Sequence, residues 1–322
     1  MSTKIEWADK TVNVAWGCEK VSPGCDHCYA ERISAVRASH PNPKIAAMYD
    51  GVVDAEGHWS NRVNMLRELP RLSGNGKRIF VGSMTDLFRA GITDDFLIRL
   101  WRWMEGYPQH TFQILTKRTE RMANFLNKHF PNPLSHVWGM TTVCNQSEAD
   151  EKIPHLLRAP LAVRGISVEP MLRAVDLGEW LFPPERTGVS YGGLSEEVAG
   201  APLLDWAICG GETGPGARPM HPDWVRGLRD QCQAAGTPFF FKGWGEWAPC
   251  SQCADDDPYI ENLSCSAPYT EIGDDGITDT DTGEGVICRN GVTTEQIFRV
   301  GKRRSGRLLD GVEWNEFPEV KI

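Results

Sequence analysis

Three cysteines, Cys18, Cys25 and Cys28, lie close together in the segment WGCEKVSPGCDHCYAER. Three thiolates on one short loop can ligate three irons of a 4Fe–4S cluster. The fourth iron then stays open to the amino and carboxylate groups of S-adenosylmethionine (SAM). The residues Ser22–Gly24 supply a turn that lets the loop wrap, and a helix is expected to start at Tyr29. The spacing therefore predicts an iron–sulfur site on a loop between a strand and a helix.

A structural zinc site is the main alternative for these cysteines. Zinc in such sites normally takes four ligands. His27 stands between two of the cysteines and is badly placed to be the fourth ligand, and His40 would reach the metal only through a long loop. With a remote fourth ligand, the chain would be a zinc-stabilised, non-catalytic nucleic-acid-binding module. Unligated thiols are the remaining alternative.

The other cysteines fall into two groups. The first group follows residue 247 and could ligate zinc or an auxiliary cluster, although only its first two members have the Cys-x2-Cys spacing of a good ligand pair. Its members are Cys250, Cys253, Cys265 and Cys288. The alternative for them is a loop with reduced cysteines. The second group, Cys144, Cys209 and Cys232, lies in apolar or helical stretches and is predicted to be buried in the core.

Short apolar runs, rich in β-branched and aromatic residues, alternate with helical patterns along the chain. The predicted strands are Arg78–Ser83, Thr111–Thr116, Val137–Thr142, Ala162–Val168, Asp205–Gly210 and Pro238–Lys242. Helical spacing covers Thr93–Glu105, Glu120–Lys128 and Pro222–Ala235. Because this alternation is typical of parallel βαβ units, we expect an α/β fold built as a full or partial parallel (β/α) barrel, with an opening strand before Cys18.

Polar and glycine residues follow four of the predicted strands. They are Ser83–Asp86, Thr116–Arg118, Ser167–Pro170 and Gly210–Glu212. In parallel barrels the active site forms at the carboxyl ends of the strands. These residues therefore predict one shared site, and the alternative is that they are ordinary turn and cap residues.

Composition and its changes along the chain indicate the domain organisation and the location of the protein. We expect a barrel over residues 1–246, an irregular acidic insertion that contains cysteines over 247–295, and a segment over 296–322 that packs back on the barrel. The net charge of −9 argues against broad, non-specific nucleic-acid binding. No apolar run reaches the roughly 18 residues of a membrane span, and the first residues lack the apolar core of a signal peptide. A cytoplasmic location is expected, where disulfides are rare.

The chain resembles a phage-associated, radical-SAM-like protein family over nearly its whole length. The blocks that carry the resemblance are IEWADKTVNVAWGCEKVSPGCDHCYAE, IFVGSMTDLF, ILTKRTERM, ISVEPML, WAICGGETGPGARPM, PFFFKGWGEW and GRLLDGVEWNEFP. The resemblance implies a barrel of radical-SAM type, with a 4Fe–4S cluster on Cys18, Cys25 and Cys28 and SAM as the second cofactor. The first cysteine gap is six residues instead of the three that are usual in radical SAM enzymes, and His27 replaces the aromatic residue expected before the third cysteine.

The resemblance also implies roles for the residues at the strand ends. Cofactor binding is expected from Ser83, Asp86, Glu169, Gly210, Gly211 and Glu212, and catalytic roles from Lys117 and Lys242. An electron from a reductase or a flavodoxin-type donor would cleave SAM, and the resulting 5′-deoxyadenosyl radical would abstract hydrogen from the substrate. The protein's task would be to position the substrate and exclude water.

The phage setting of the family implies a modified thymidine as substrate, either as free nucleoside or in DNA. The reaction would be an isomerisation in DNA hypermodification, in which a glycine on the thymine 5-methylene moves from nitrogen to carbon linkage in the host cytoplasm. A DNA-repair-type radical SAM lyase is the alternative enzyme. Duplex DNA as substrate would require base flipping. Two basic clusters would then contact phosphates, and the alternative is that they are solvated surface charges. The first cluster is Lys117, Arg118 and Arg121, and the second is Lys302, Arg303, Arg304 and Arg307.

Overall fold

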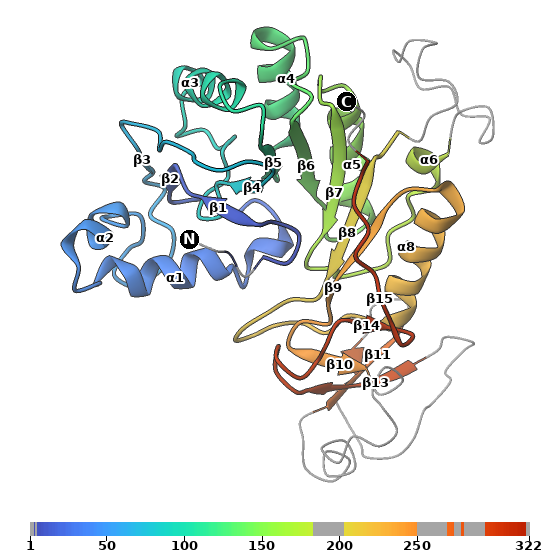
Figure 1. Cartoon of the computed structure of the whole chain (residues 1–322). Helices are drawn as coiled ribbons and strands as arrows, with labels where there is room; N and C mark the ends of the chain where they lie inside the picture. The colour runs from blue at the N-terminus through green and yellow to red at the C-terminus, as the bar shows by residue number, and fades with distance from the viewer. Residues whose placement is uncertain are drawn as a thin grey trace. The chain divides into compact units, whose positions relative to one another are not determined.

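The computed structural model describes two compact units of the chain (Figure 1). Described residues are 3, 5–182, 203–249, 269–273, 278–279 and 294–319. Unit 1 comprises Met1–Thr142, Glu151–Gly165 and Glu319–Ile322, and unit 2 comprises Val143–Asp150 and Ile166–Pro318. Within the described ranges, no helix is long and apolar enough to cross a membrane. The predicted second metal site, Cys250, Cys253, Cys265 and Cys288, lies outside them.

Seven strands form the main sheet in the order β1-β4-β5-β6-β7-β8-β9. Their bounds are β1 Lys10–Val12, β4 Arg78–Val81, β5 Thr111–Thr116, β6 Val137–Thr142, β7 Val163–Val168, β8 Trp206–Gly210 and β9 Phe239–Gly243. The pairs β1–β4, β4–β5, β5–β6 and β8–β9 are parallel. Because the strand order follows the chain and ends at β1 and β9, the expected α/β fold is confirmed in its partial-barrel form. Strand β7 is divided between the two units.

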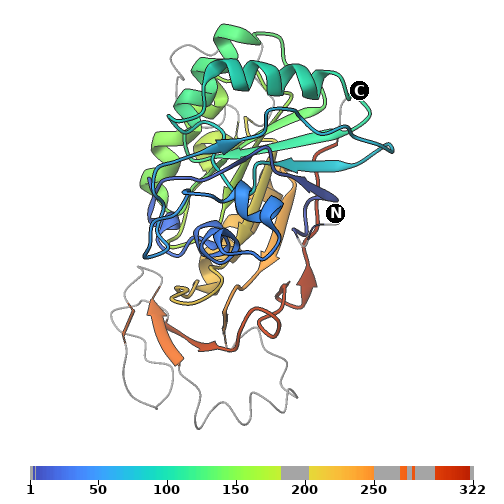
Figure 2. The same cartoon turned by 90° about the vertical axis from the view of Figure 1, so that its left-hand side faces the viewer.

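Unit 1 adds helices and one short antiparallel pair to its strands. These elements are β2 Ala15–Trp16 paired with β3 Asn64–Met65, and the helices α1 Tyr29–Ala38, α2 Pro43–Met48, α3 Asp94–Glu105 and α4 Thr119–His129. In both views, α3 and α4 lie on one side of β1 and β4, and α1 and α2 lie on the other (Figures 1 and 2). Helix α3 starts as predicted, because the Thr93 side chain caps the Phe96 amide at 3.3 Å.

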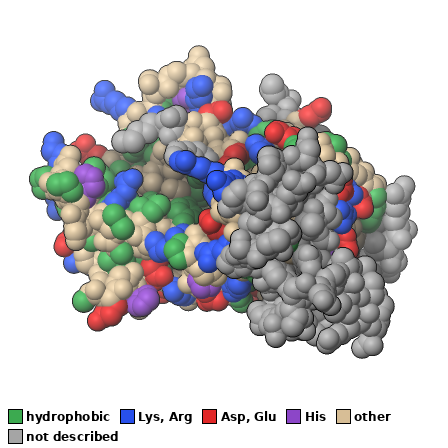
Figure 3. Space-filling model, turned by 90° about the horizontal axis from the view of Figure 1, so that it is seen from below, with side chains coloured by type: hydrophobic (Ala, Val, Ile, Leu, Met, Phe, Trp, Pro, Cys, Tyr) green, Lys and Arg blue, Asp and Glu red, His purple; other side chains and the backbone are tan. Residues whose placement is uncertain are grey.

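Helix α1 buries polar side chains and exposes apolar ones, which is the reverse of the pattern of an ordinary surface helix. It buries Glu31 and Ser34, whereas Ile33 and Val36 are 37% and 75% exposed. Figure 3 shows hydrophobic side chains reaching the surface in the left-hand part of the molecule, where α1 and α2 lie in Figure 1. The buried Glu31 is satisfied, because it accepts from the Trp59 amide at 2.9 Å and pairs with Lys20 at 3.0 Å. A polar helix face therefore ties α1 to the loop that carries the cysteines.

Unit 2 combines the last strands of the main sheet with a separate antiparallel sheet. Its helices include α6 Gly178–Leu181 and α8 Pro222–Ala235, and α5 Gln146–Leu157 is shared with unit 1. The antiparallel sheet has the order β10-β13-β11-β12, from Trp247–Pro249, Thr294–Arg299, Tyr269–Gly273 and Thr278–Asp279, and β14 Leu308–Leu309 pairs with β15 Val312–Glu313. The insertion predicted as irregular thus contributes regular strands where the structure describes it.

The described residues also show how the scattered cysteines and the C-terminal residues pack. Cys144, Cys209 and Cys232 are fully buried, which confirms them as core residues. Burial raises the pKa of the Cys232 thiol to about 12. The C-terminal residues pair with β9 inside unit 2, where the Phe241 amide donates to the Trp314 carbonyl at 2.9 Å.

A glycine pair offers a test of the packing at the end of β8. A Cβ on Gly211 would lie 2.0 Å from the Trp244 carbonyl oxygen, whereas a Cβ on Gly227, inside α8, would meet nothing within 4 Å. We expect Gly211→Ala to lower the free energy of unfolding by about 3 kcal/mol through overpacking. Gly227→Ala should raise it by up to about 1 kcal/mol through helix propensity. Urea denaturation measures both, and equal stabilities of the two variants would contradict the packing.

Candidate functional site

The cysteine loop of unit 1 starts at a backbone position that requires glycine. Gly17 has φ +101°, and a Cβ there would lie 2.2 Å from the Arg62 carbonyl oxygen. The Gly17 amide donates to the Met84 carbonyl at 3.2 Å, and its carbonyl accepts from Thr85 Oγ1 at 2.6 Å. These bonds place Cys18 beside the turn that follows β4.

The other two cysteines are held by local turn and helix geometry. The Ser22 side chain accepts from the Gly24 amide at 3.1 Å and opens a short 3-10 turn, Pro23–Cys25. Cys28 is the N-cap residue of α1, where the helix dipole favours a thiolate. All three thiols are free, with Cys25 buried and the other two partly buried. The predicted loop and the helix start at Tyr29 are both present.

Burial controls the protonation of two of these thiols. It raises the pKa of Cys18 to about 11, where the Asp86 carboxylate adds to the shift and Arg118 opposes it. Burial also raises the pKa of Cys28, against backbone hydrogen bonds from Glu31 and Ala30 and the charge of Lys117. Both thiols are therefore protonated at neutral pH without a metal, and a bound metal would displace the protons.

The donor set of this loop fits an iron–sulfur cluster. In the described part of the chain, no group of three or more His, Cys, Asp and Glu side chains could hold a single metal ion. A cluster makes a different demand, because each cysteine binds its own iron. Three free thiols on one loop meet that demand. The charge of Lys117 near Cys28 favours an anionic group, whereas near Cys18 the charge of Arg118 opposes that of Asp86.

Asp86 locks the ends of β4 and β5 together. Its carboxylate oxygens accept from Thr116 Oγ1 at 2.6 Å, the Lys117 amide at 2.8 Å, the Phe88 amide at 3.0 Å and Arg118 Nη1 at 2.9 Å. The residue is only 7% exposed. Its observed role is therefore to position these strand ends, and its predicted contact with a cofactor stays a prediction.

Arg118 extends this arrangement to the cysteine loop. Its Nη2 donates to Glu19 Oε1 at 2.7 Å, and Arg89 lies 3.7 Å from the other oxygen of Glu19. Glu19 directly follows Cys18, so the loop is tied by charge to the end of β5. We call Glu19, Asp86, Arg89 and Arg118 the Asp86 network. Sequence reasoning missed Glu19 and Arg89, and the only available signal was an acidic residue next to a candidate ligand.

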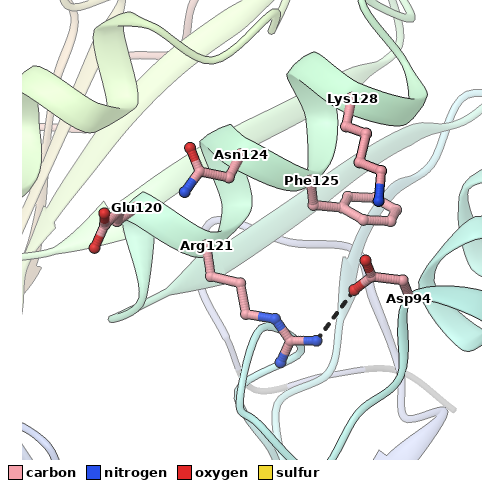
Figure 4. Close-up of a pocket in the computed structure, with 6 residues that line it drawn as sticks. All are labelled: Asp94, Glu120, Arg121, Asn124, Phe125 and Lys128. Carbon is pink, nitrogen blue, oxygen red and sulfur yellow. Dashed lines mark hydrogen bonds and ion pairs between the residues drawn. The ribbon is translucent and has the colours of Figure 1, made fainter.

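The two arginines of the first basic cluster are bound within the protein, and a phosphate contact from this cluster stays a prediction. Arg118 belongs to the Asp86 network, and Arg121 donates to the carbonyls of Phe88 at 3.1 Å and Ile92 at 2.5 Å and pairs with Asp94 at 3.3 Å. Figure 4 shows Arg121 turned toward Asp94 in a surface cavity of about 340 Å³. Its lining comes from the start of α3 and from α4: Asp94, Glu120, Arg121, Asn124, Phe125 and Lys128.

Ser83 also stands beside the cysteine loop of unit 1. Its hydroxyl donates to Asn13 Oδ1 at 3.0 Å, and its carbonyl accepts from the Tyr29 hydroxyl at 2.6 Å. Lys117, its neighbour at the next strand end, uses its backbone amide for Asp86. Ser83, Asp86 and Lys117 thus lie at the ends of β4 and β5, near the loop that carries Cys18, and their roles at a shared site stay predictions.

A second group of predicted residues lies in unit 2. The Lys242 ammonium donates to the Glu169 carboxylate, and both side chains are about one fifth exposed, at 20% and 23%. Gly210 separates them, since a Cβ there would lie 3.2 Å from Lys242 Cβ and 3.6 Å from Glu169 Cδ. The carboxyl ends of β7, β8 and β9 therefore meet at an ion pair that packs closely over a glycine.

Gly211 and Glu212 contact the protein itself. The Gly211 backbone packs against the Trp244 carbonyl, and the Glu212 carboxylate accepts from the Arg218 guanidinium at 2.7 and 2.9 Å and from the Arg218 amide at 2.8 Å. Gly211 thus approaches a backbone carbonyl, and Glu212 binds an arginine of the same chain. Ligand contacts from Gly210, Gly211 and Glu212 stay predictions.

The Asp86 network generates a stability prediction. Asp86→Ala removes a buried acceptor of four hydrogen bonds and leaves Arg118 with only Glu19 as its ion-pair partner. We expect a loss of roughly 3–5 kcal/mol in the free energy of unfolding. The control Asp94→Ala removes a carboxylate that is 47% exposed and should cost about 1 kcal/mol or less. Similar urea midpoints for both variants would contradict this role of Asp86.

Comparison with solved structures gives a partial likeness to spore photoproduct lyase. One lyase complexed with a dinucleoside spore photoproduct has a TM-score of 0.37 and 13% sequence identity, over 72% of this chain and 62% of that one. A variant with bound AdoMet and the same dinucleoside has a TM-score of 0.36 and 12% identity over the same shares. The chain thus spans less than two thirds of the length of these lyases. No curated protein sequence matches it.

One protein family covers almost the whole sequence. It is described as "Protein of unknown function (DUF5131)", and the match extends over residues 2–318. The match includes the cysteine loop, the Asp86 network and the Glu169–Lys242 pair. The chain therefore belongs to the DUF5131 family.

Proposed function

We propose that this protein is a radical SAM enzyme that holds a 4Fe–4S cluster on Cys18, Cys25 and Cys28. The observation that carries the proposal is the set of three free thiols on one loop of unit 1, beside the carboxyl ends of parallel strands. A zinc module needs a fourth ligand, whereas a SAM-binding cluster needs one iron without a protein ligand. The donor set supports the cluster.

The reduced cluster would supply the electron that cleaves SAM to methionine and a 5′-deoxyadenosyl radical, which abstracts hydrogen from the substrate. The chain's own residues have positioning roles. Arg118 fixes Glu19, which is the residue next to Cys18. Lys20 forms an ion pair with the buried Glu31 of α1. The start of the loop is thus held before any ligand binds, which reduces the ordering cost of binding.

Polar groups at the strand ends are proposed to bind SAM and substrate. In unit 1, Ser83 and Lys117 would act near SAM. In unit 2, Glu169 would accept from an amine or hydroxyl group, and Lys242 would meet a carboxylate or phosphate. Lys242 and Glu169 satisfy each other in the structure, so a ligand would bind by exchanging one partner of this pair.

The proposed substrate is a modified thymidine of phage DNA. The resemblance of the sequence blocks to a phage-associated family supports this choice. The reaction would move a glycine on the thymine 5-methylene from nitrogen to carbon linkage, which is an isomerisation without change in mass. A reductase or flavodoxin-type donor in the host cytoplasm would supply the electron.

The central prediction concerns iron and SAM. Purified without oxygen and reconstituted with iron and sulfide, the protein should carry about four irons and release 5′-deoxyadenosine from SAM after reduction. The Cys18/Cys25/Cys28→Ala variant should do neither. The matched control is Cys144/Cys232→Ala, which removes buried thiols outside the loop and should keep both properties. Stoichiometric zinc with intact SAM would sink the proposal.

The same anaerobic assay identifies the reaction class. With a thymidine carrying an N-linked glycine, alone and within DNA, we expect a product of equal mass with a new carbon–carbon linkage. Mass spectrometry and NMR distinguish that product from the substrate. Conversion of damaged DNA, and not of the modified nucleoside, would assign the enzyme to the repair-type lyases.

A second prediction concerns the ion pair of unit 2. Lys242→Met and Glu169→Gln each remove one charge of the pair, so ligand binding at these strand ends should fail. We expect SAM cleavage to fall at least about 100-fold, as for the loss of a positioned polar group, while iron content stays at the wild-type level. The control Asp310→Asn weakens ion pairs with Arg226 and Arg229 and should leave cleavage unchanged. Cleavage within threefold of wild type in both pair variants would refute the role.

A further inference from the structure

The second basic cluster has a different environment from the first. Lys302, Arg303 and Arg304 are consecutive and exposed in a chain whose net charge is −9. Arg299, also exposed, donates to the Gly214 carbonyl at 3.3 Å and adds a fourth cation. This local concentration of positive charge stands out against an acidic molecule.

Arg307, which the sequence groups with these residues, is separate from them. Its guanidinium lies 5.3 Å from the centre of the Phe240 ring, and it donates to the Asn315 side chain. We therefore define the basic turn as Arg299, Lys302, Arg303 and Arg304.

The backbone of the basic turn is fixed. The Arg304 amide donates to the Gly301 carbonyl at 2.9 Å, and the Ser305 amide donates to the same oxygen at 3.2 Å. Ser305 is 8% exposed, and its hydroxyl donates to the Gly245 carbonyl at 2.6 Å. Because the backbone is already ordered, binding an anion costs no further backbone entropy at the turn.

The same bonds attach the turn to the end of β9. The amides of Val300 and Gly301 donate to the Glu246 carbonyl at 3.1 and 2.9 Å, and the Trp244 amide donates to Gly306 at 3.2 Å. Trp244 directly follows β9, whose Lys242 pairs with Glu169. The turn is therefore built onto the strand end that carries the candidate ligand-binding pair of unit 2.

We propose that the basic turn binds backbone phosphates of duplex DNA whose modified base binds at the Glu169–Lys242 strand ends of unit 2. This inference rests on the proposed function and extends it to polymeric DNA as the substrate. Clustered Lys and Arg side chains bind phosphates without reading sequence. The acidic remainder of the chain opposes binding elsewhere, so DNA contact concentrates at the turn. A flipped base and its flanking phosphates belong to one strand, which requires phosphate contacts near the reacting site.

Anisotropy of a fluorescein-labelled 20-base-pair duplex, measured without SAM, tests the inference. The variant K302Q/R303Q/R304Q loses three cations, so the slope of log affinity against log salt should fall by about 2.7. Between 50 and 200 mM KCl the variant should then lose roughly 40-fold less affinity than wild type. The control K44Q/R67Q/R71Q removes three exposed cations of unit 1 and should bind as wild type does.

The remaining outcomes are equally decisive. Equal salt slopes for the turn variant and wild type overturn the inference, as does an equal loss in the control variant. Binding of the turn to phosphatidylserine vesicles, with unchanged DNA affinity, also overturns it and assigns the turn to a lipid surface. The 5′-deoxyadenosine assay separates the two proposals: a protein that leaves SAM intact but shows the predicted slopes keeps the phosphate site and loses the radical SAM function.

Discussion

The buried carboxylate of Asp86 is the constraint on which the cysteine region of unit 1 depends. A carboxylate this far from water is stable only when its oxygens are hydrogen-bonded and its charge is paired. Asp86 meets both conditions with donors from the turn after β4 and from the end of β5. Arg118, which neutralises it, also holds Glu19 beside Cys18. The ion pair between Asp86 and Arg118 thus joins the strand ends, and Arg118 also orients the cysteine loop through Glu19.

Sequence patterns predicted the elements of the sheet because each depends on local signals. The strand Thr111–Thr116 matches β5 at both ends, and the helical pattern Thr93–Glu105 matches α3 together with its N-cap residue Thr93. The free, clustered thiols and the helix that starts at Tyr29 were also visible from spacing. Helix α5 was not anticipated, because it contains Pro154, a residue that normally argues against a helix interior.

The side-chain partners within the site were harder to predict, because they come from distant parts of the sequence. Glu19 and Arg118 are 99 residues apart, and no periodicity links them. The first basic cluster looked like a surface patch for the same reason, since neither of its arginines has its carboxylate partner nearby in sequence. Gly211 raised a related ambiguity: a glycine marks a close approach, but only the structure shows that the approaching group is the Trp244 carbonyl.

The cysteine loop has a consequence for how the protein matures. Gly17, Glu19 and Ser22 hold the loop through hydrogen bonds and an ion pair within the protein itself. In a zinc finger, by contrast, folding and metal binding are a single event. Under the proposed function, the polypeptide would fold first and receive iron and sulfide afterwards. If oxygen destroyed the proposed cluster, a folded apoprotein would remain, and it could be reloaded without refolding.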